Sequence, residues 1–257
     1  MHTPRPKGTV PPKWVIEKLR GTDRQSYILD HGFSDEQLSI KWFQDELNNA
    51  GLGQFQVSIN PNGAEGSHDR LTRGDLFALA SRAESEDDVL NFLWHVLIWG
   101  HGKAKKNGRR RIAAFKSDSD RRKNLDLLTR ALALVRQGDV KNAYKTLIRR
   151  GGAQIPYLGP AFFTKFLYFN SNIETGQIFP ILDSRVAESI YRSTGWDMHP
   201  AAPRDEPVEF SGNWYIPTYE EYCDLLTEWG TAVSDDIGRY VARDELERAL
   251  FEGEPRT

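Results

Sequence analysis

One stretch of the sequence, residues 89–99, is apolar on nearly every side of a helix. The acidic run Ser85-Glu86-Asp87-Asp88 precedes it, which is typical of a first helical turn. Gly100-His101-Gly102 follows it and ends the pattern. Because a helix that is apolar all round has to be buried, the rest of the chain must pack around this segment. The sequence therefore predicts a helical protein with one helix running through its core.

The remaining pattern is also mainly helical. Helices are predicted at 34–49, from 119 or 120 to about 137, and at 140–150, 156–169, 184–191, 218–234 and 240–251. Residues 54–72 indicate a loop with one short strand at 55–59, and 195–217 indicate an ordered loop or hairpin. We expect an all-α fold, a helical bundle in two lobes. Residues 1–72 form an N-terminal segment that packs on a core of 73–257.

Composition excludes several classes of protein. No apolar run approaches the roughly 20 residues of a membrane span, and the proline-rich N-terminus lacks the apolar core of a secretion signal. A single cysteine, Cys223, excludes an internal disulfide and any multi-cysteine metal site. The six histidines show no ligand spacing, so we expect no metal. We expect a cytoplasmic protein.

The net charge of −2 conceals a strongly uneven distribution. Residues 101–150 hold 16 Lys and Arg against 4 Asp and Glu, a net of +12, whereas residues 201–257 hold 5 against 14, a net of −9. Asp235, Asp236 and the Glu-rich last helix are interpreted as a solvated face. The basic block can be a solvated face too, but its density is that of a surface that binds phosphates. Six cations fall within nine positions: Lys103, Lys105, Lys106, Arg109, Arg110 and Arg111.

The most informative stretch is Ile155-Pro156-Tyr157-Leu158-Gly159-Pro160-Ala161, followed by Pro180-Ile181-Leu182-Asp183-Ser184-Arg185-Val186. It predicts a short helix, a tight turn at Leu158-Gly159 and a second helix that begins near Pro160. The free N–H groups of that second helix would suit an anion such as phosphate. A Gly-Pro helix start is also common in proteins that bind no anion.

This combination resembles the helix-hairpin-helix DNA glycosylases, and most closely the bacterial 8-oxoguanine DNA glycosylase-like proteins, over roughly residues 70–250. In that family a Leu-Pro-Gly-Val-Gly hairpin precedes an invariant aspartate by some twenty residues. The resemblance implies an enzyme that flips a nucleotide out of duplex DNA and cleaves the bond between base and deoxyribose. It also implies a monomer on double-stranded DNA, and a monovalent cation held by the hairpin carbonyls; no other cofactor is expected.

Asp183 is the candidate carboxylate that stabilises the positive charge developing on the sugar. Its alternative role is an ordinary helix N-cap. The family's bifunctional members carry a nucleophilic lysine where this chain has Ala161, and Lys165 stands one helical turn later. Lys165 can replace that nucleophile, contact a substituent of the base, or pack its stem on Phe162 and Phe166 with the ammonium in solvent or on a phosphate. We expect hydrolysis by water that leaves an abasic site.

The remaining interface candidates follow from the resemblance. Leu158, Gly159 and Ala161 would meet the DNA at the hairpin, the six cations would hold phosphates, and His101 and Asn107 are candidates to fill the gap left by the flipped base. Five aromatic residues are candidates for base stacking without a ranking: Trp196, Trp214, Tyr215, Tyr240 and Phe251.

Three classes of function remain open. The first is a glycosylase acting either on damaged bases such as 8-oxoguanine, in DNA repair, or on modified bases of phage DNA, in antiphage defence. Its variant is a bifunctional glycosylase and lyase that uses Lys165. The second is a non-catalytic helix-hairpin-helix DNA-binding protein. The third is a helical protein unrelated to DNA whose basic cluster contacts an acidic partner.

Overall fold

The computed structural model describes residues 3–63, 69–149, 152–173, 175–198 and 214–255, and most of these are helical. The helices are α1 (Lys13–Arg20), the π-helix η1 (Gln25–Leu29), α2 (Asp35–Leu38), α3 (Ile40–Asn49), α4 (Arg73–Ser81), α5 (Glu86–His101), α6 (Gly108–Ala113), α7 (Asp118–Arg136), α8 (Val140–Leu147), α9 (Pro160–Phe169), α10 (Ser184–Thr194), α11 (Ile216–Ile237) and α12 (Arg243–Glu252). Two small antiparallel pairs join β1 (Gly32–Phe33) to β2 (Leu71–Thr72), and β3 (Ile148–Arg149) to β4 (Gly152–Ala153). The all-α prediction is confirmed.

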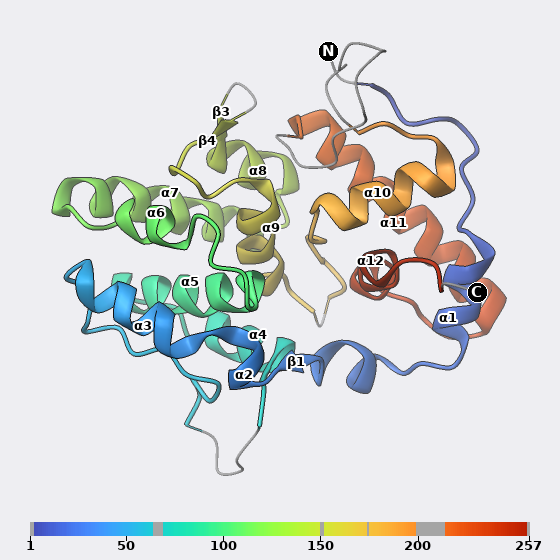
Figure 1. The fold of residues 1–257 in the computed structure, drawn as a ribbon. Coiled ribbons are helices and arrows are strands. Elements are labelled where there is room, and N and C mark those ends of the chain that lie inside the picture. Colours follow the sequence, from blue (N-terminus) through green and yellow to red (C-terminus); the bar gives the residue numbers. More distant parts are fainter. Residues whose placement is uncertain (1–2, 64–68, 150–151, 174, 199–213, 256–257) are drawn as a thin grey trace.

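The helices gather in two groups (Figure 1). We call α2 to α8 the middle lobe and α1 with α10, α11 and α12 the terminal lobe; α9 lies between them. In the middle lobe α5 packs against α4, α7 and α9, and in the terminal lobe α12 packs against α1, α10 and α11. Residues 1–72 are shared between the lobes, because α1 packs on α11 and α12 whereas α3 packs on α6.

Helix α5 is the buried helix that its sequence predicts. Every residue from Val89 to Trp99 except Asn91 is buried. Ser85 caps the helix by accepting the N–H of Asp88, whose carboxylate in turn accepts the N–H of Ser85. The helix ends at His101, beside α9 and at the boundary between the lobes, so it brings residues 99–102 to the place where the two lobes meet.

Several local predictions are wrong. Helix 34–49 is interrupted by Ser39, whose left-handed backbone separates α2 from α3. Residues 55–59 form no strand, and helix 140–150 ends at Leu147, where the chain turns into β3. Helices α1, α4 and α6 were not predicted, although Thr72 and Asp75 form a capping box at the start of α4. Residues 199–213 of the predicted loop at 195–217 lie outside the described residues.

Helix α12 differs most from its predicted role. Its carboxylates Asp244, Glu245 and Glu247 are buried, and each contacts an arginine. The solvated face predicted for this helix is therefore wrong, whereas Asp235 and Asp236 at the end of α11 are exposed as predicted. None of the described helices combines the length and the hydropathy needed to cross a membrane.

Candidate active site

Asp183 uses its two carboxylate oxygens for different neighbours. Oδ1 accepts the backbone N–H groups of Arg185 and Val186, at 3.1 and 3.2 Å, and so caps helix α10. Oδ2 lies 3.4 Å from Nζ of Lys165. The cap fixes the carboxylate at the start of α10 and leaves its second oxygen directed at α9. The two roles predicted for Asp183, helix N-cap and catalytic carboxylate, are therefore compatible.

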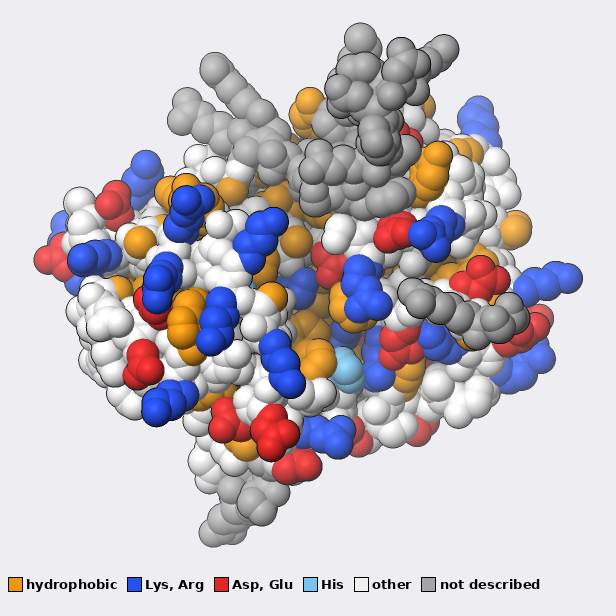
Figure 2. Space-filling view, in the orientation of Figure 1, with side chains coloured by type: hydrophobic (Ala, Val, Ile, Leu, Met, Phe, Trp, Pro, Cys, Tyr) orange, Lys and Arg blue, Asp and Glu red, His pale blue; other side chains and the backbone are white. Residues whose placement is uncertain are grey.

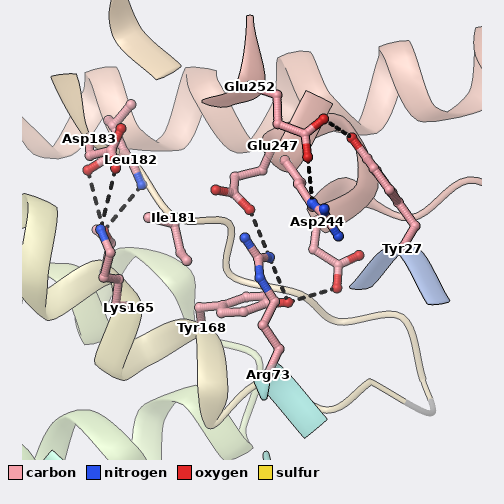
Figure 3. Close-up of polar contacts among 12 residues, drawn as sticks. Tyr27, Arg73, Lys165, Tyr168, Ile181, Leu182, Asp183, Asp244, Glu247 and Glu252 are labelled. Carbon is pink, nitrogen blue, oxygen red and sulfur yellow. Dashed lines mark hydrogen bonds and ion pairs between the residues drawn. The ribbon is translucent and has the colours of Figure 1, made fainter. Parts of the chain in front are cut away.

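Lys165 lies on α9 and extends toward Asp183 (Figure 3). Its ammonium donates a hydrogen bond of 2.7 Å to the carbonyl of Ala161, one turn earlier. The side chain is buried, so the solvated role considered for it does not fit. Its stem passes Gly100 of α5 so closely that a Cβ at residue 100 would lie 3.0 Å from Lys165 Cδ. Glycine at this position leaves the space that the lysine stem occupies.

Lys165 and Asp183 both line a cavity of about 200 Å³ where the lobes meet. Residues from β1, α4, α5, α9 and α12 contribute to its lining, and Phe33, Trp99 and Phe251 supply aromatic surface. In the space-filling view the surface is hollowed between the two lobes, and a histidine side chain is visible there (Figure 2). At about 30 Å³ of liquid volume per water molecule, the cavity has room for one small molecule rather than for a large ligand.

A buried charge network borders the cavity on the side of α12 (Figure 3). Nη1 of Arg73 donates to Glu247 at 3.0 Å and to the hydroxyl of Tyr168 at 3.1 Å, and that hydroxyl lies 3.1 Å from Asp244. Burial raises the pKa of Glu247 to about 6 despite the neighbouring Arg73 cation. Arg73 and Glu247 also line the cavity, so its wall offers a cation and a carboxylate together.

His101, a candidate to fill the DNA gap, is turned into the protein. Its Nδ1 lies 3.0 Å from the carbonyl of Ala104, which can only accept, so Nδ1 carries the proton and Nε2 accepts from Arg111 at 2.8 Å. Burial and the Arg111 charge lower the pKa of His101 to about 4. A neutral imidazole held in this way forms part of the cavity wall.

Arg111 differs from the other cations of the basic cluster because it is buried. Its guanidinium lies 3.6 Å from the centre of the Phe162 ring and donates to the carbonyls of Tyr157 and Lys106. Burial lowers the pKa of Arg111 to about 10. These contacts make Arg111 a positioning residue between α6 and the turn before α9, and leave it little access to a phosphate.

The other five cations of the cluster lie at the surface around α6. Lys103, Lys105, Lys106, Arg109 and Arg110 are exposed, and Asn107 is half-buried at the start of α6 with φ of +61°. Arg109 contacts Glu46 of α3 at 2.8 Å, and Lys105 lies over the ring of Trp42. In Figure 2, Lys and Arg side chains are spread over the face of the middle lobe beside the hollow.

The turn before α9 only partly matches its prediction. Strand β4 and a turn precede Leu158, so the short helix expected there is absent from the described residues. The side chain of Leu158 is buried, Gly159 has open space around it, and Ala161 is half-buried. Tyr157, where the family pattern has glycine, has φ of +62°, a conformation that costs an aromatic residue about 1–3 kcal/mol.

The turn does not fit the monovalent cation that the resemblance implies. The carbonyl of Tyr157 already accepts a hydrogen bond of 2.8 Å from Nε of Arg111. The Ile155 carbonyl accepts the N–H of Leu158, and the Gly159 carbonyl accepts N–H groups of α9. A second positive charge beside the buried guanidinium would be repelled, so we assign no ion to the turn. Among the described residues, no three His, Cys, Asp or Glu side chains converge as metal ligands.

The unranked aromatic candidates separate by burial. Trp196 and Trp214 belong to the core, and Phe251 lines the cavity. Tyr215 is half-buried at the start of α11, and Tyr240 is exposed between α11 and α12. Sequence reasoning missed the cavity residues His31, Phe33, Arg73, Trp99 and Glu247, and also Tyr157. The departure of Tyr157 from the glycine pattern was the one available signal among them.

The comparisons with known proteins agree with the resemblance seen in the sequence. The OGG family, described as "Putative 8-oxoguanine DNA glycosylase OGG-like protein", matches residues 27–251. No curated protein and no solved structure matches the chain. The matched range includes α2 to α11, α12 up to Phe251, and every residue of the cavity described above. The match covers well over half of the chain, which therefore belongs to the OGG family of 8-oxoguanine DNA glycosylase-like proteins.

Proposed function

We propose that this protein is a DNA glycosylase that flips a modified or damaged base into the cavity between the lobes and releases it by hydrolysis. The observation that carries the proposal is the placement of Asp183 and Lys165 at 3.4 Å from each other on the wall of a cavity with aromatic sides. Family membership supports the same activity. The exposed cations Lys103, Lys105, Lys106, Arg109 and Arg110 supply the phosphate contacts.

Asp183 performs the central step. Cleavage of the N-glycosidic bond leaves its electron pair on the base and positive charge on the sugar, and Oδ2 stabilises that charge because Oδ1 is already held by the α10 cap. A water molecule then attacks C1′ and gives a proton to Oδ2 of Asp183, and the released base takes up a proton in turn, which leaves an abasic site. Lys165 positions Oδ2 and presents a hydrogen-bond donor to the base. The aromatic walls stack on the flipped base and exclude water from it.

Asp183→Asn is the decisive variant. Asparagine caps a helix as well as aspartate does, so α10 stays capped while the negative charge is lost. We expect single-turnover base release to fall by roughly 10²–10⁴, the range for loss of one such catalytic group, with duplex affinity changed by no more than a few fold. Unchanged base release would remove Asp183 from the mechanism. A wild-type protein that binds duplex but releases no base would favour the non-catalytic DNA-binding alternative.

The substrate base is identified by a screen of duplex oligonucleotides that each carry one modified base. Release of free 8-oxoguanine would favour a role in DNA repair. Release of an enlarged or hydroxylated base, with 8-oxoguanine left intact, would favour attack on modified phage DNA. We expect the active species to be a monomer on double-stranded DNA, which is checked by measuring the mass of the complex in solution.

The position of Lys165 favours a second candidate, a bifunctional glycosylase and lyase. Its amine lines the cavity beside Asp183, where a flipped nucleotide would place its sugar. Attack by that amine on C1′ would displace the base, and opening of the sugar ring at the C1′–O4′ bond would then give a Schiff base that borohydride traps on the DNA. Attack requires the side chain of Lys165 to give up a proton first, and Oδ2 of Asp183, 3.4 Å away, is placed to accept it. The hydrolytic mechanism predicts no trapped adduct; an adduct that disappears in Lys165→Gln would establish the lyase.

A further inference from the structure

Tyr157 is an exposed aromatic residue at the tip of the turn before α9. About half of its surface, 48%, is accessible to solvent, although most large apolar side chains of this chain are buried. The guanidinium of Arg110 lies 5.1 Å from the centre of its ring. One face of the ring is therefore paired with a cation that is itself exposed and free to move to a phosphate.

The backbone of Tyr157 is held in a conformation that its side chain opposes. Its φ of +62° lies in the left-handed region, which glycine adopts without the steric conflict that a Cβ creates. Nε of Arg111 donates to the Tyr157 carbonyl at 2.8 Å and fixes the turn. That hydrogen bond uses only the backbone, so glycine would satisfy it equally well. Folding therefore gives no reason for an aromatic ring at this position.

The turn is directly connected to the cavity wall. The same Arg111 guanidinium that holds the Tyr157 carbonyl also contacts Nε2 of His101 and the ring of Phe162. His101 lines the cavity, and the Phe162 ring lies 5.8 Å from Nζ of Lys165. Tyr157 is thus fixed relative to the place where the proposed function puts the flipped nucleotide.

The charge around Tyr157 identifies the occupant of this surface as nucleic acid. Arg110 stacks on Tyr157, and Lys105 stacks on Trp42, which together with Arg109 lines a surface hollow of about 380 Å³. Aromatic rings interleaved with exposed cations are the arrangement that holds unstacked bases and their backbone. An acidic peptide would pair with the cations but would leave the aromatic rings without a partner.

We infer that Tyr157 stacks on the DNA base that loses its partner when the substrate nucleotide is flipped out, while Arg110 moves to a neighbouring phosphate. This assigns to the turn the filling of the gap in the DNA, for which the sequence offered His101 and Asn107. The side chain of His101 is directed into the protein. The inference rests on the proposed function, because it requires DNA with a displaced nucleotide. It concerns binding at the gap and can fail while base release persists.

The test compares two duplexes, one fully paired and one in which an abasic-site analogue leaves a base without a partner. For Tyr157→Gly we expect the affinity for the duplex with the abasic-site analogue to fall at least tenfold, as on loss of one stacked base. The affinity for the fully paired duplex should change less than twofold. Tyr157→Phe should retain both affinities. Thermal unfolding of Tyr157→Gly should occur at or above the wild-type temperature, because glycine accepts the backbone conformation.

A fluorescent 2-aminopurine placed opposite the abasic-site analogue reports directly whether an aromatic ring stacks on that base. Wild-type protein and Tyr157→Phe should quench its fluorescence, whereas Tyr157→Gly should not. Tyr240→Ala, which removes another exposed tyrosine, is the control and should behave as wild type. Equal losses on both duplexes, or normal quenching by Tyr157→Gly, would overturn the inference. Absence of base release in wild type, with the duplex preference intact, would instead count against the proposed function alone.

Discussion

At the residue scale, the arrangement at Asp183 shows how one carboxylate can be fixed by a helix cap and still line a cavity. Two N–H donors of α10 fix Oδ1, and Lys165 approaches Oδ2 at 3.4 Å. Lys165 is itself fixed by its bond to the Ala161 carbonyl and by contact with Gly100. A catalytic group that is held before the substrate arrives does not have to reorganise in the transition state.

Gly100→Ala tests whether this placement matters. The new Cβ would lie 3.0 Å from Lys165 Cδ and 3.3 Å from Phe162 Cε1, so the lysine stem must shift away from its position. We expect base release to fall several fold, less than the roughly 10²-fold cost of a 1 Å misplacement, because the lysine stem shifts by only a few tenths of an ångström, while the unfolding free energy changes little. Single-turnover kinetics and urea unfolding measure the two quantities.

Gly21→Ala is the matched control, since a Cβ there meets nothing within 4 Å. It should leave both the rate of base release and the unfolding free energy close to the wild-type values. If Gly100→Ala released base at the wild-type rate, the position of the Lys165 stem would be irrelevant to the reaction.

The family resemblance predicted Asp183 and Lys165 as site candidates, through the positions that match the family's aspartate and lie near its lysine. It could not predict the pairing of Arg73 with Glu247, which joins residues 174 positions apart. Nor could it separate Arg111 from its neighbours, because the composition of a basic run does not show which cation the helix directs inward. Tyr157 was visible only as a departure from a pattern, and its exposure required the fold.

At the element scale, α5 stabilises the middle lobe and also makes it sensitive to acid. His95 is buried, with Nδ1 2.8 Å from the Asn91 carbonyl and Nε2 accepting the N–H of Ser58. Burial lowers its pKa from 6.5 to about 4. His95 therefore binds a proton at a higher pH in the unfolded chain than in the folded chain. Its contribution to the free energy of unfolding is fully present above pH 6.5 and is lost as the pH falls toward 4.

His95→Gln measures this contribution. Wild type should lose stability relative to the variant by up to about 1.4 kcal/mol for each pH unit between 6.5 and 4. Urea unfolding at several pH values in that window gives the difference, which isolates His95 from groups that titrate in both proteins. Glu247, whose raised pKa acts in the opposite direction between about 4.5 and 6, is one of those groups and cancels in the comparison. A difference independent of pH would contradict the assignment of a neutral, buried His95.

The buried pair between α4 and α12 ties the two lobes together. Glu247→Gln would leave the Arg73 guanidinium buried without its carboxylate partner, and we expect it to destabilise the protein by about 3–5 kcal/mol in urea unfolding at pH 8. The double variant Arg73→Met with Glu247→Leu should recover much of that loss, because it removes both charges. An equal loss in both variants would mean that packing at these positions, rather than the unpaired charge, sets the stability.

Apolar patterns predicted the long helices well, since α7 and α11 each bury a face that repeats at helical spacing and α5 is buried on almost every side. Breaks within a pattern were missed where they depend on a single backbone conformation, as at Ser39 between α2 and α3. The short pair β3 and β4 has two residues in each strand and leaves no periodic signal.

At the scale of the whole molecule, the uneven charge along the chain becomes an ordered pairing in space. Cations from the N-terminal part of the chain meet carboxylates of α11 and α12, in the pairs Arg5–Glu228, Lys18–Glu252, Arg20–Asp236, Arg24–Asp244 and Arg73–Glu247. Five carboxylates of the acidic C-terminal part are thereby neutralised within the protein. The five exposed cations around α6 face solvent instead. Among the described residues, Arg109 is the one of these five that forms a salt bridge, with Glu46. The net charge of −2 therefore understates the positive surface that DNA would meet.

This surface predicts a steep salt dependence of DNA binding. If Lys103, Lys105, Lys106, Arg109 and Arg110 each neutralise a phosphate, the logarithm of the association constant should fall with the logarithm of salt concentration with a slope of about −4.5, at about −0.9 for each contact. Lys105→Ala with Lys106→Ala should make that slope less steep by about 2, because two counterions fewer are released. Lys7→Ala with Lys13→Ala removes two exposed cations of the N-terminal region, away from α6, and should leave the slope unchanged. Equal slopes for the two double variants would show that the protein meets DNA through its overall charge and not through the cluster around α6.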